Sequence, residues 1–396
     1  MKHAPVYLIA AAGLILTACT SAQPIRAADA ATPTRTPRPT IAPTATATSS
    51  PIPTGTPAST PPATPLPTIA PTATATPPPR IRRLTVGDCC TGPFWSPDST
   101  EVRFIDRNPN GGPAGVWGID ITQPNPEPYF ITAKLGVTSP DGRLLAYPER
   151  QTGLAVIERL DTGETWRVDL AQSPPSFTPD SSALFWTETD RDLPFEQRVA
   201  TFWLSGLKGE NRRPLITLSR GSPLAWLGDD TLLVATFEDA DTPTGAGDTI
   251  LARLSLENGA LTELLRTERP RGIALNRAGT GMVYYAILSQ NSAGNGVWHV
   301  DLTQQPLTPR RLPFLGSYQW QTNNTLIYIP FEADASRHVF YGYNLNTGQT
   351  VQLTSVAQAE LTVANNDWRV SPDGRKIVLL ASRNRQLDGL WLVELN

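Results

Sequence analysis

The sequence predicts an all-β fold, a seven-bladed β-propeller, for residues 80–396 of this 396-residue chain. Three observations support the prediction. A turn resembling Ser-Pro-Asp-Gly recurs every 40–50 residues or so, and four short apolar segments accompany each turn. The last repeat also lacks a fourth segment, which the stretch before the first repeat can supply. Weaker repeats in the middle of the chain leave six blades as an alternative.

The N-terminus has the features of a secretory leader. Lys2 and His3 precede an apolar run over residues 4–16, which is shorter than the ~20 residues that span a bilayer. Residues 16–19 read Leu-Thr-Ala-Cys, which resembles the bacterial lipoprotein box. The resemblance implies that residues 1–19 are a lipoprotein signal and that Cys19 carries lipid. We therefore expect an extracytoplasmic protein anchored to a bacterial membrane, at the cell surface or in the periplasm. Ordinary cleavage after Ala22 is the alternative.

Residues 20–79 are predicted to be a disordered stalk. Positions 24–79 contain 16 Pro and 15 Thr and no aromatic residue. Closely spaced prolines exclude helix and sheet pairing, and a segment without large apolar side chains cannot offset the entropy of ordering. The stalk is expected to hold the remaining domain, residues 80–396, away from the membrane.

The first repeat shows the predicted four-stranded unit. A strand and turn cover residues 94–99, a second strand covers 102–105, a third covers 116–121, and a fourth lies near 128–132. Proline presets φ at the first central turn position, while Asp and Gly suit the next two. The Asp residues of these turns are therefore predicted to shape the chain rather than to act as catalytic groups or metal ligands. The turn recurs at 139–142, 178–181 and 371–374, and in weaker form at 227–230, 276–279 and 321–324.

The two ends of the domain are predicted to close the ring. The last repeat stops after its third strand, at residues 390–395. The missing fourth strand matches residues 82–85, whose pattern resembles 309–312 and 351–354. Pairing of these ends would leave no fully open sheet edge.

The repeated unit resembles the WD-like repeat of the TolB-type propellers over nearly all of residues 80–396. The resemblance implies a propeller fold and a function through protein contacts. Prolyl oligopeptidases carry a similar propeller beside a hydrolase domain. Here no chain remains for such a domain, and no Gly-x-Ser-x-Gly motif is present.

Composition narrows the range of possible functions. Residues 81–396 hold 28 basic and 35 acidic residues, a balance that disfavours nucleic acid as a partner. Only three His occur, and no Cys/His spacing resembles a metal site, so no cofactor, metal or catalytic set is predicted. The adjacent Cys89 and Cys90 are expected to form a vicinal disulfide or to be two inert thiols.

Loop lengths indicate where a partner would bind. The loops between second and third strands look long in six blades, at 106–115, 187–199, 238–248, 289–296, 332–337 and 382–388. Long polar loops on a rigid scaffold are common carriers of recognition, although propeller loops also vary without functional reason. The candidate binding residues are Phe195, Arg337, His338, Arg383 and Arg385, with Asp367 and Arg369 at the mouth of the central channel.

Two classes of function remain. The first is a non-enzymatic binding or scaffold lipoprotein, expected to be a monomer, that recognises a protein or glycan at the cell envelope. The second is a hydrolase or lyase that acts on polysaccharide or peptide through loop carboxylates. Asp367 is the only carboxylate on the predicted channel-lining strands. A two-carboxylate centre at the channel would therefore lack its second member.

Overall fold

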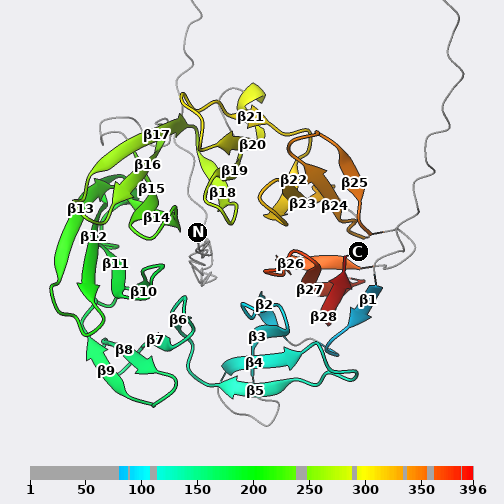
Figure 1. The fold of residues 1–396 in the computed structure, drawn as a ribbon, viewed down its shortest axis with the longest axis horizontal. Coiled ribbons are helices and arrows are strands. Elements are labelled where there is room, and N and C mark those ends of the chain that lie inside the picture. The colour runs from blue at the N-terminus through cyan, green and yellow to red at the C-terminus, as the bar shows by residue number, and fades with distance from the viewer. Residues whose placement is uncertain are drawn as a thin grey trace, which may run out of the picture. The chain divides into compact units, whose positions relative to one another are not determined.

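The computed structural model describes residues 80–87, 90–107, 114–237, 248–287, 292–332, 337–354, 361–384 and 386–395. Their strands form seven four-stranded antiparallel sheets arranged as blades around a central axis (Figure 1). The predicted all-β seven-bladed propeller is thus confirmed, and six blades are excluded. The predicted leader, Cys19 and the stalk lie outside the described residues. No helix among the described residues has the length and apolar character needed to cross a membrane.

Each blade takes four strands in order from the axis outward. Blades 1 to 6 consist of β2–β5, β6–β9, β10–β13, β14–β17, β18–β21 and β22–β25, and blade 7 consists of β26–β28 with β1 outermost. The strand bounds are β1 (Arg80–Arg83), β2 (Thr91–Trp95), β3 (Glu101–Arg107), β4 (Ala114–Asp120), β5 (Tyr129–Thr132), β6 (Val137–Thr138), β7 (Leu144–Pro148), β8 (Ala155–Arg159), β9 (Thr165–Val168), β10 (Ser176–Phe177), β11 (Ala183–Thr189), β12 (Val199–Gly206), β13 (Arg213–Ser219), β14 (Ser222–Trp226), β15 (Thr231–Phe237), β16 (Thr249–Ser255), β17 (Leu261–Thr267), β18 (Pro270–Leu275), β19 (Gly281–Ala286), β20 (Gly296–Asp301), β21 (Arg310–Arg311), β22 (Gly316–Trp320), β23 (Thr325–Pro330), β24 (Tyr341–Asn344), β25 (Thr350–Gln352), β26 (Thr362–Val370), β27 (Lys376–Arg383) and β28 (Gln386–Glu394). Two short 3-10 helices, η1 (Phe195–Gln197) and η2 (Ser292–Gly294), interrupt the loops.

The second strand of most blades is an apolar run because neighbouring blades cover both of its faces. In β15, five consecutive residues between Thr231 and Phe237 are buried, and β27 shows the same pattern. Period-two alternation is therefore lost in these strands, as expected for sheets buried on both faces.

Blade-to-blade packing forms the core. Six clusters of buried apolar side chains each join two adjacent blades, for example Val102 and Phe104 of blade 1 with Val378 and Leu380 of blade 7. Blades 1 and 2 are not joined by such a cluster in the described part of the chain.

The Ser-Pro-Asp and Thr-Pro-Asp turns of blades 1, 2, 3 and 7 build hydrogen bonds within their own blades. In blade 1, the Ser96 hydroxyl donates to Asp98 Oδ1 at 2.6 Å and accepts from the Glu101 amide at 2.9 Å. The Ser96 hydroxyl, together with the hydroxyl and amide of Thr100, lowers the pKa of Asp98. The Asp is thus a structural acceptor, as predicted.

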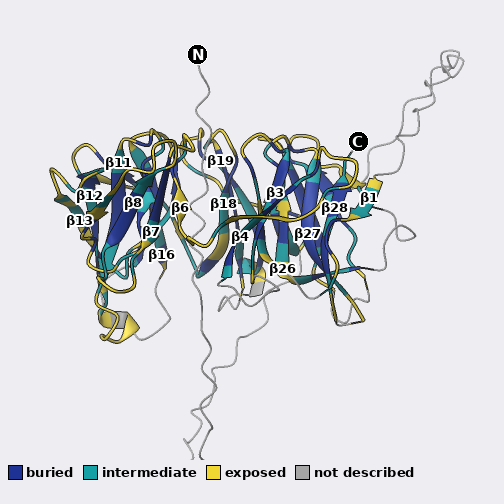
Figure 2. Ribbon diagram, turned by 90° about the horizontal axis from the view of Figure 1, so that it is seen from below, coloured by how far each residue is buried: buried dark blue, intermediate teal, exposed yellow. Residues whose placement is uncertain are grey.

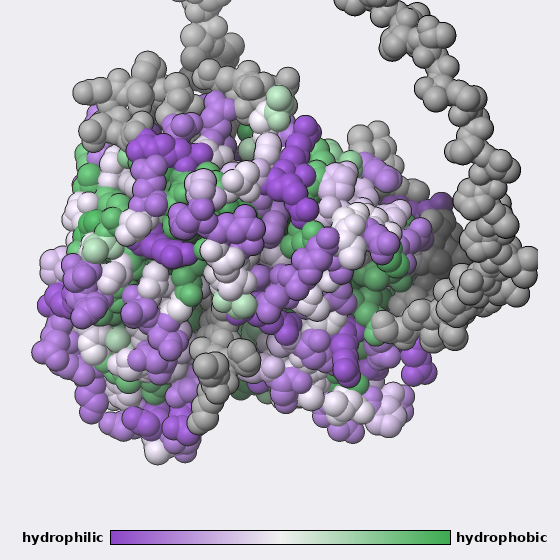
Figure 3. Space-filling model, turned by 45° about the horizontal axis from the view of Figure 1, so that its top comes forward, coloured by the Kyte–Doolittle hydropathy of each residue, from purple (hydrophilic) through white to green (hydrophobic). Residues whose placement is uncertain are grey.

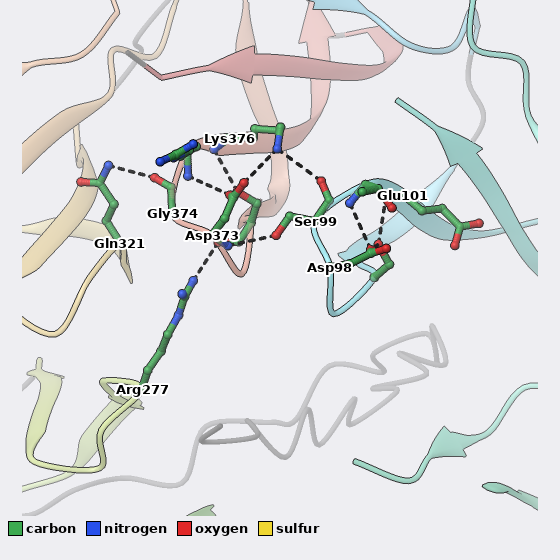
Figure 4. Close-up of polar contacts among 12 residues, drawn as sticks. Asp98, Ser99, Glu101, Arg277, Gln321, Asp373, Gly374 and Lys376 are labelled. Carbon is green, nitrogen blue, oxygen red and sulfur yellow. Dashed lines mark hydrogen bonds and ion pairs between the residues drawn. The ribbon is translucent and has the colours of Figure 1, made fainter. Parts of the chain in front are cut away.

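The same turns also form hydrogen bonds between neighbouring blades. The Asp373 amide of blade 7 donates to Ser99 Oγ of blade 1 at 2.9 Å, and Lys376 Nζ reaches the Ser99 carbonyl at 3.3 Å (Figure 4). The Asp141 amide makes the equivalent bond to Ser181 Oγ at 3.0 Å. Where a turn ends in Gly374 instead, a Cβ atom there would stand 2.6 Å from the Gln321 carbonyl oxygen of the neighbouring blade. At Ser99, Ser181 and Gly374, the last turn position therefore lies at the contact between two blades.

Replacing Ser99 tests how much this hydrogen bond between blades 7 and 1 contributes to stability. Ser99→Ala removes the acceptor of the Asp373 amide and should lower the free energy of unfolding by about 1 kcal/mol. Ser99 has φ 63°, so Ser99→Gly should cost less, since glycine recovers about 0.5 kcal/mol in this left-handed conformation. Urea unfolding of both variants measures the difference, and equal losses would contradict the strain argument.

The ring closes as the sequence predicts. Strand β1 pairs antiparallel with β28, with Ile81 opposite Val393, and the Leu84 amide donates to the Leu390 carbonyl at 2.8 Å. Leu84 is buried in the cluster between blades 7 and 1. The first segment of the domain thus completes the last blade.

The predicted long loop at 382–388 is wrong. Pairing of β27 with β28 continues through Ser382–Leu387 and Arg383–Gln386, so strands occupy most of the segment that was predicted to be a loop. Asn384 takes φ 52°, a left-handed conformation that Asn tolerates and that a tight hairpin turn requires. The polar composition of residues 382–388 indicates a loop. The left-handed conformation of Asn384 instead lets β27 and β28 extend through most of this segment.

The domain has two distinct faces. The turns between first and second strands and between third and fourth strands form one face, called here the short-turn face. The loops between second and third strands and the links between blades form the other, the long-loop face. Figure 2 shows the short turns along the upper edge, while η1 projects from the lower edge.

Candidate functional site: the long-loop face

Exposed apolar side chains gather in the loops and links of the long-loop face. In the described segments of that face they are Val86, Leu135, Leu193, Phe195, Ile287, Leu315 and Phe331. In the turns of the short-turn face, the described residues include one such side chain, Leu160. Figure 3 looks obliquely at the short-turn face and outer wall, where hydrophilic residues predominate and hydrophobic ones show in separate patches. The long-loop face therefore carries more exposed apolar side chains in its described loops and links than the short-turn face carries in its described turns.

One part of this surface lies on the loop between β11 and β12. Arg198 fixes the loop from within, because its guanidinium donates to the carbonyls of Leu193 and Arg191, each at 2.8 Å. The amide of Arg198 closes the 3-10 turn on the carbonyl of Phe195 at 3.3 Å. The loop therefore holds Phe195 in a defined position although its side chain is 52% exposed.

Phe195 belongs to an aromatic–arginine cluster that spans blades 3 and 4. Its ring meets the edge of Phe237 with centroids 6.1 Å apart. Arg220, in the link between the two blades, places its guanidinium carbon 4.3 Å from the centre of the Phe237 ring and 5.9 Å from that of Phe195. Cation–π and edge-to-face contacts of this kind contribute about 0.5–2 kcal/mol each. The cluster thus presents a pre-organised apolar surface with a cation at its base.

A second apolar part lies at blades 5 and 6. Phe331 is 79% exposed, and its amide donates to the Leu315 carbonyl at 2.9 Å, which ties the loop after β23 to the link before β22. Leu315 and Ile287 are also exposed there.

The charged candidates lie on blades 6 and 7, away from Phe195. Arg337 is exposed on the loop before β24. Arg383 lies 3.6 Å from Asp388, which also pairs with Arg83 at 2.7 Å, so its charge is shared within the blade. Arg385 lies outside the described residues.

His338 is held by backbone groups. Its Nδ1 atom accepts from the Val363 amide at 2.9 Å, and its own amide donates to the Leu361 carbonyl at 2.9 Å. Burial lowers the pKa of His338, in keeping with a neutral ring. The imidazole joins the long-loop ends of blades 6 and 7 and lines an internal cavity of about 20 Å³ there.

Asp367 and Arg369 lie on β26, the innermost strand of blade 7 (Figure 1). Four residues, 364–367, separate Val363 and Trp368, whose partners Ala381 and Leu379 are only two positions apart. This bulge brings Asn365, Asn366 and Asp367 out of the ladder. The Asp367 carboxylate forms no hydrogen bond or ion pair with any part of the chain that the structure describes.

Across the described ranges, no group of three or more His, Cys, Asp or Glu side chains could hold a metal ion. Cys90 is disulfide-bonded, and its partner lies outside the described residues.

The sequence analysis missed Arg220, Phe237 and Phe331. Arg220 and Phe237 meet Phe195 only because blades 3 and 4 are neighbours, and no spacing in the chain indicates that contact. Phe331 follows the buried strand β23 directly and resembles its continuation in the sequence.

Comparisons with known proteins agree on the fold. No protein-family model matches the chain, and no curated protein aligns with it. An oligogalacturonate lyase in complex with manganese aligns over 80% of this chain and 93% of its own, with 14% identity and a TM-score of 0.58. The β-propeller domain of the trilobed protease from Pyrococcus furiosus aligns over 78% and 95%, with 13% identity and a TM-score of 0.54.

Two further likenesses are partial. The acylaminoacyl peptidase of Pyrococcus horikoshii aligns over 77% of this chain but 51% of its own, with 13% identity and a TM-score of 0.52. TolB from Acinetobacter baumannii aligns over 66% and 65%, at 14% identity and a TM-score of 0.40, too low to carry an argument. At these identities a likeness shows architecture and not activity. The comparisons and the sheet topology together identify the described part of the chain as a seven-bladed β-propeller.

Proposed function

We propose that this chain is a non-enzymatic binding lipoprotein of the bacterial cell envelope, which recognises a protein partner through its long-loop face. The observation that supports the proposal most strongly is the aromatic–arginine cluster of Phe195, Arg220 and Phe237. Protein interfaces draw most of their binding energy from a few aromatic and Arg side chains in well-packed surroundings. A loop already fixed by Arg198 loses little entropy on binding, which favours affinity.

Loss of the exposed ring should strongly weaken capture of the partner. Phe195→Ser leaves the hydrogen bonds of the loop in place but removes the apolar anchor, and it should weaken partner binding tenfold or more. Crosslinking on cells, followed by quantitative recovery of bound proteins, compares the variant with the parent chain.

Leu160→Ser is the matched control. Leu160 is 48% exposed, close to the 52% of Phe195, but lies on the short-turn face. The proposal expects a partner that both the parent and Leu160→Ser recover and that Phe195→Ser loses. Equal recovery by all three chains would place the interaction elsewhere.

An enzyme remains the second candidate, and the bulge in β26 is the observation that favours it. Bulges are over-represented next to active sites, and this one carries the carboxylate of Asp367. A hydrolase or lyase acting on polysaccharide or peptide would use that group. Turnover in a substrate screen with the full chain, abolished by Asp367→Asn, would establish the enzyme and displace the binding function.

A further inference from the structure

A groove lies between blades 5 and 6. Its volume of about 840 Å³ falls within the ~300–1,000 Å³ typical of ligand pockets. Leu312, Phe314 and Tyr343 line it, and the exposed Ile287 and Leu315 form its rim toward the long-loop face. Phe314 is fixed by stacking on Tyr328 at 3.9 Å between centroids and by an edge contact with Tyr343 at 5.7 Å. The apolar wall is therefore rigid.

Arg311 is the one charged residue among those that line this groove. Its backbone is held in β21, opposite Trp298 of β20. Gly296 gives its side chain room, because a Cβ atom at that position would stand 2.7 Å from Arg311 Nε. The guanidinium forms no hydrogen bond or ion pair with any described residue.

The adjacent residue Arg310 differs from Arg311 in that its guanidinium has a partner in the fold. Arg310 Nη2 donates to the Leu345 carbonyl of blade 6 at 2.9 Å, so this guanidinium joins two blades. Arg310 is therefore committed to the fold, while the donors of Arg311 face the groove. A guanidinium beside aromatic walls is suited to a carboxylate, which it binds through two parallel hydrogen bonds.

We propose that this groove binds a peptide segment that carries an aromatic or branched apolar side chain next to a carboxylate. The apolar side chain packs on Phe314 and Tyr343, and the carboxylate pairs with Arg311. The carboxylate comes from the C-terminus of the peptide or from an adjacent acidic residue. The site does not depend on the cluster around Phe195, which lies on blades 3 and 4.

Titration of the full chain with matched small ligands tests the proposal. N-acetyl-phenylalanine carries a terminal carboxylate, N-acetyl-glutamyl-phenylalaninamide carries one on a side chain, and N-acetyl-phenylalaninamide carries none. At least one of the two acids should bind about tenfold more tightly than the uncharged amide, as measured by ligand-observed NMR or calorimetry. The acid that binds more tightly identifies the source of the carboxylate.

Two variants assign the preference to the groove. Arg311→Gln should bring the affinity of the acids down to that of the amide. Arg150→Gln, which removes an exposed arginine on blade 2, should leave the tenfold preference unchanged. Equal affinity of both acids and the amide for the parent chain would overturn the proposal. A preference that survives Arg311→Gln would overturn it as well. Neither result bears on the capture experiment with Phe195→Ser, so the two hypotheses fail separately.

Discussion

Leu84→Asp is expected to lower the free energy of unfolding by at least about 3 kcal/mol. Leu84 is 7% exposed and packs between blades 7 and 1, directly after the closing strand β1. The substitution removes a buried apolar side chain and places a carboxylate within a cluster of apolar side chains. Because β1 is the outer strand of blade 7, the weakened junction is the one that holds the ring closed. Urea unfolding followed by tryptophan fluorescence measures the loss.

The matched control for this prediction is Val86→Asp. Val86 is two residues further along the same segment and 80% exposed, so the same charge there should change stability by less than about 0.5 kcal/mol. A small effect of Leu84→Asp, comparable with that of Val86→Asp, would mean that ring closure contributes little to stability.

Trp368→Ala should have a similarly large effect, a loss of about 3–5 kcal/mol. Trp368 is fully buried in the cluster between blades 6 and 7, where its ring meets Phe340 at 5.3 Å between centroids. Its indole Nε1 donates to Ser317 Oγ of blade 6 at 2.8 Å and lies 3.2 Å from Asn366 Oδ1 in the bulge. Truncation to Ala therefore leaves a cavity and also removes the hydrogen bond to Ser317 that connects the two blades.

Two milder variants separate packing from hydrogen bonding. Trp368→Phe retains most of the apolar volume but loses the indole donor, and we expect a loss of about 1–2 kcal/mol. Ser317→Ala should cost about 1 kcal/mol or less, because Asn366 remains as an acceptor. A double-mutant cycle on these two positions measures their coupling. If Trp368→Phe proved as costly as Trp368→Ala, packing would not be the main contribution.

The fold could be predicted because its signals are local and repeated. The Ser-Pro-Asp turns are determined by a few consecutive residues, and their hydrogen bonds lie within six positions of the chain, as between Ser96 and Glu101. Closure of the ring could also be predicted. The last repeat lacks its fourth strand, and the segment before the first repeat supplies one extra strand, so the two are expected to pair. The extension of β27 and β28 toward residue 384 could not be predicted. It depends on one Asn in the left-handed conformation, which lets two polar segments pair.

The candidate site was predictable only in part. Phe195 stands out in the sequence as an aromatic residue within a polar loop, but the sequence does not show that Arg220 and Phe237 complete its cluster. The same holds for the groove. Arg310 and Arg311 are adjacent in the chain, but the Arg310 side chain bonds to the next blade while Arg311 lines the groove.

The sequence by itself thus determined the repeat, the propeller architecture and the closing strand, while the structure decided between six and seven blades. The tertiary structure alone decided which side chains of neighbouring blades meet, which arginines are occupied by the fold and which face a groove. The physical reason is the range of the interactions. Turn geometry and strand patterning depend on neighbours in the chain, whereas contacts between blades join residues about 40 positions apart, as between Asp141 and Ser181, and no local preference of the chain specifies them.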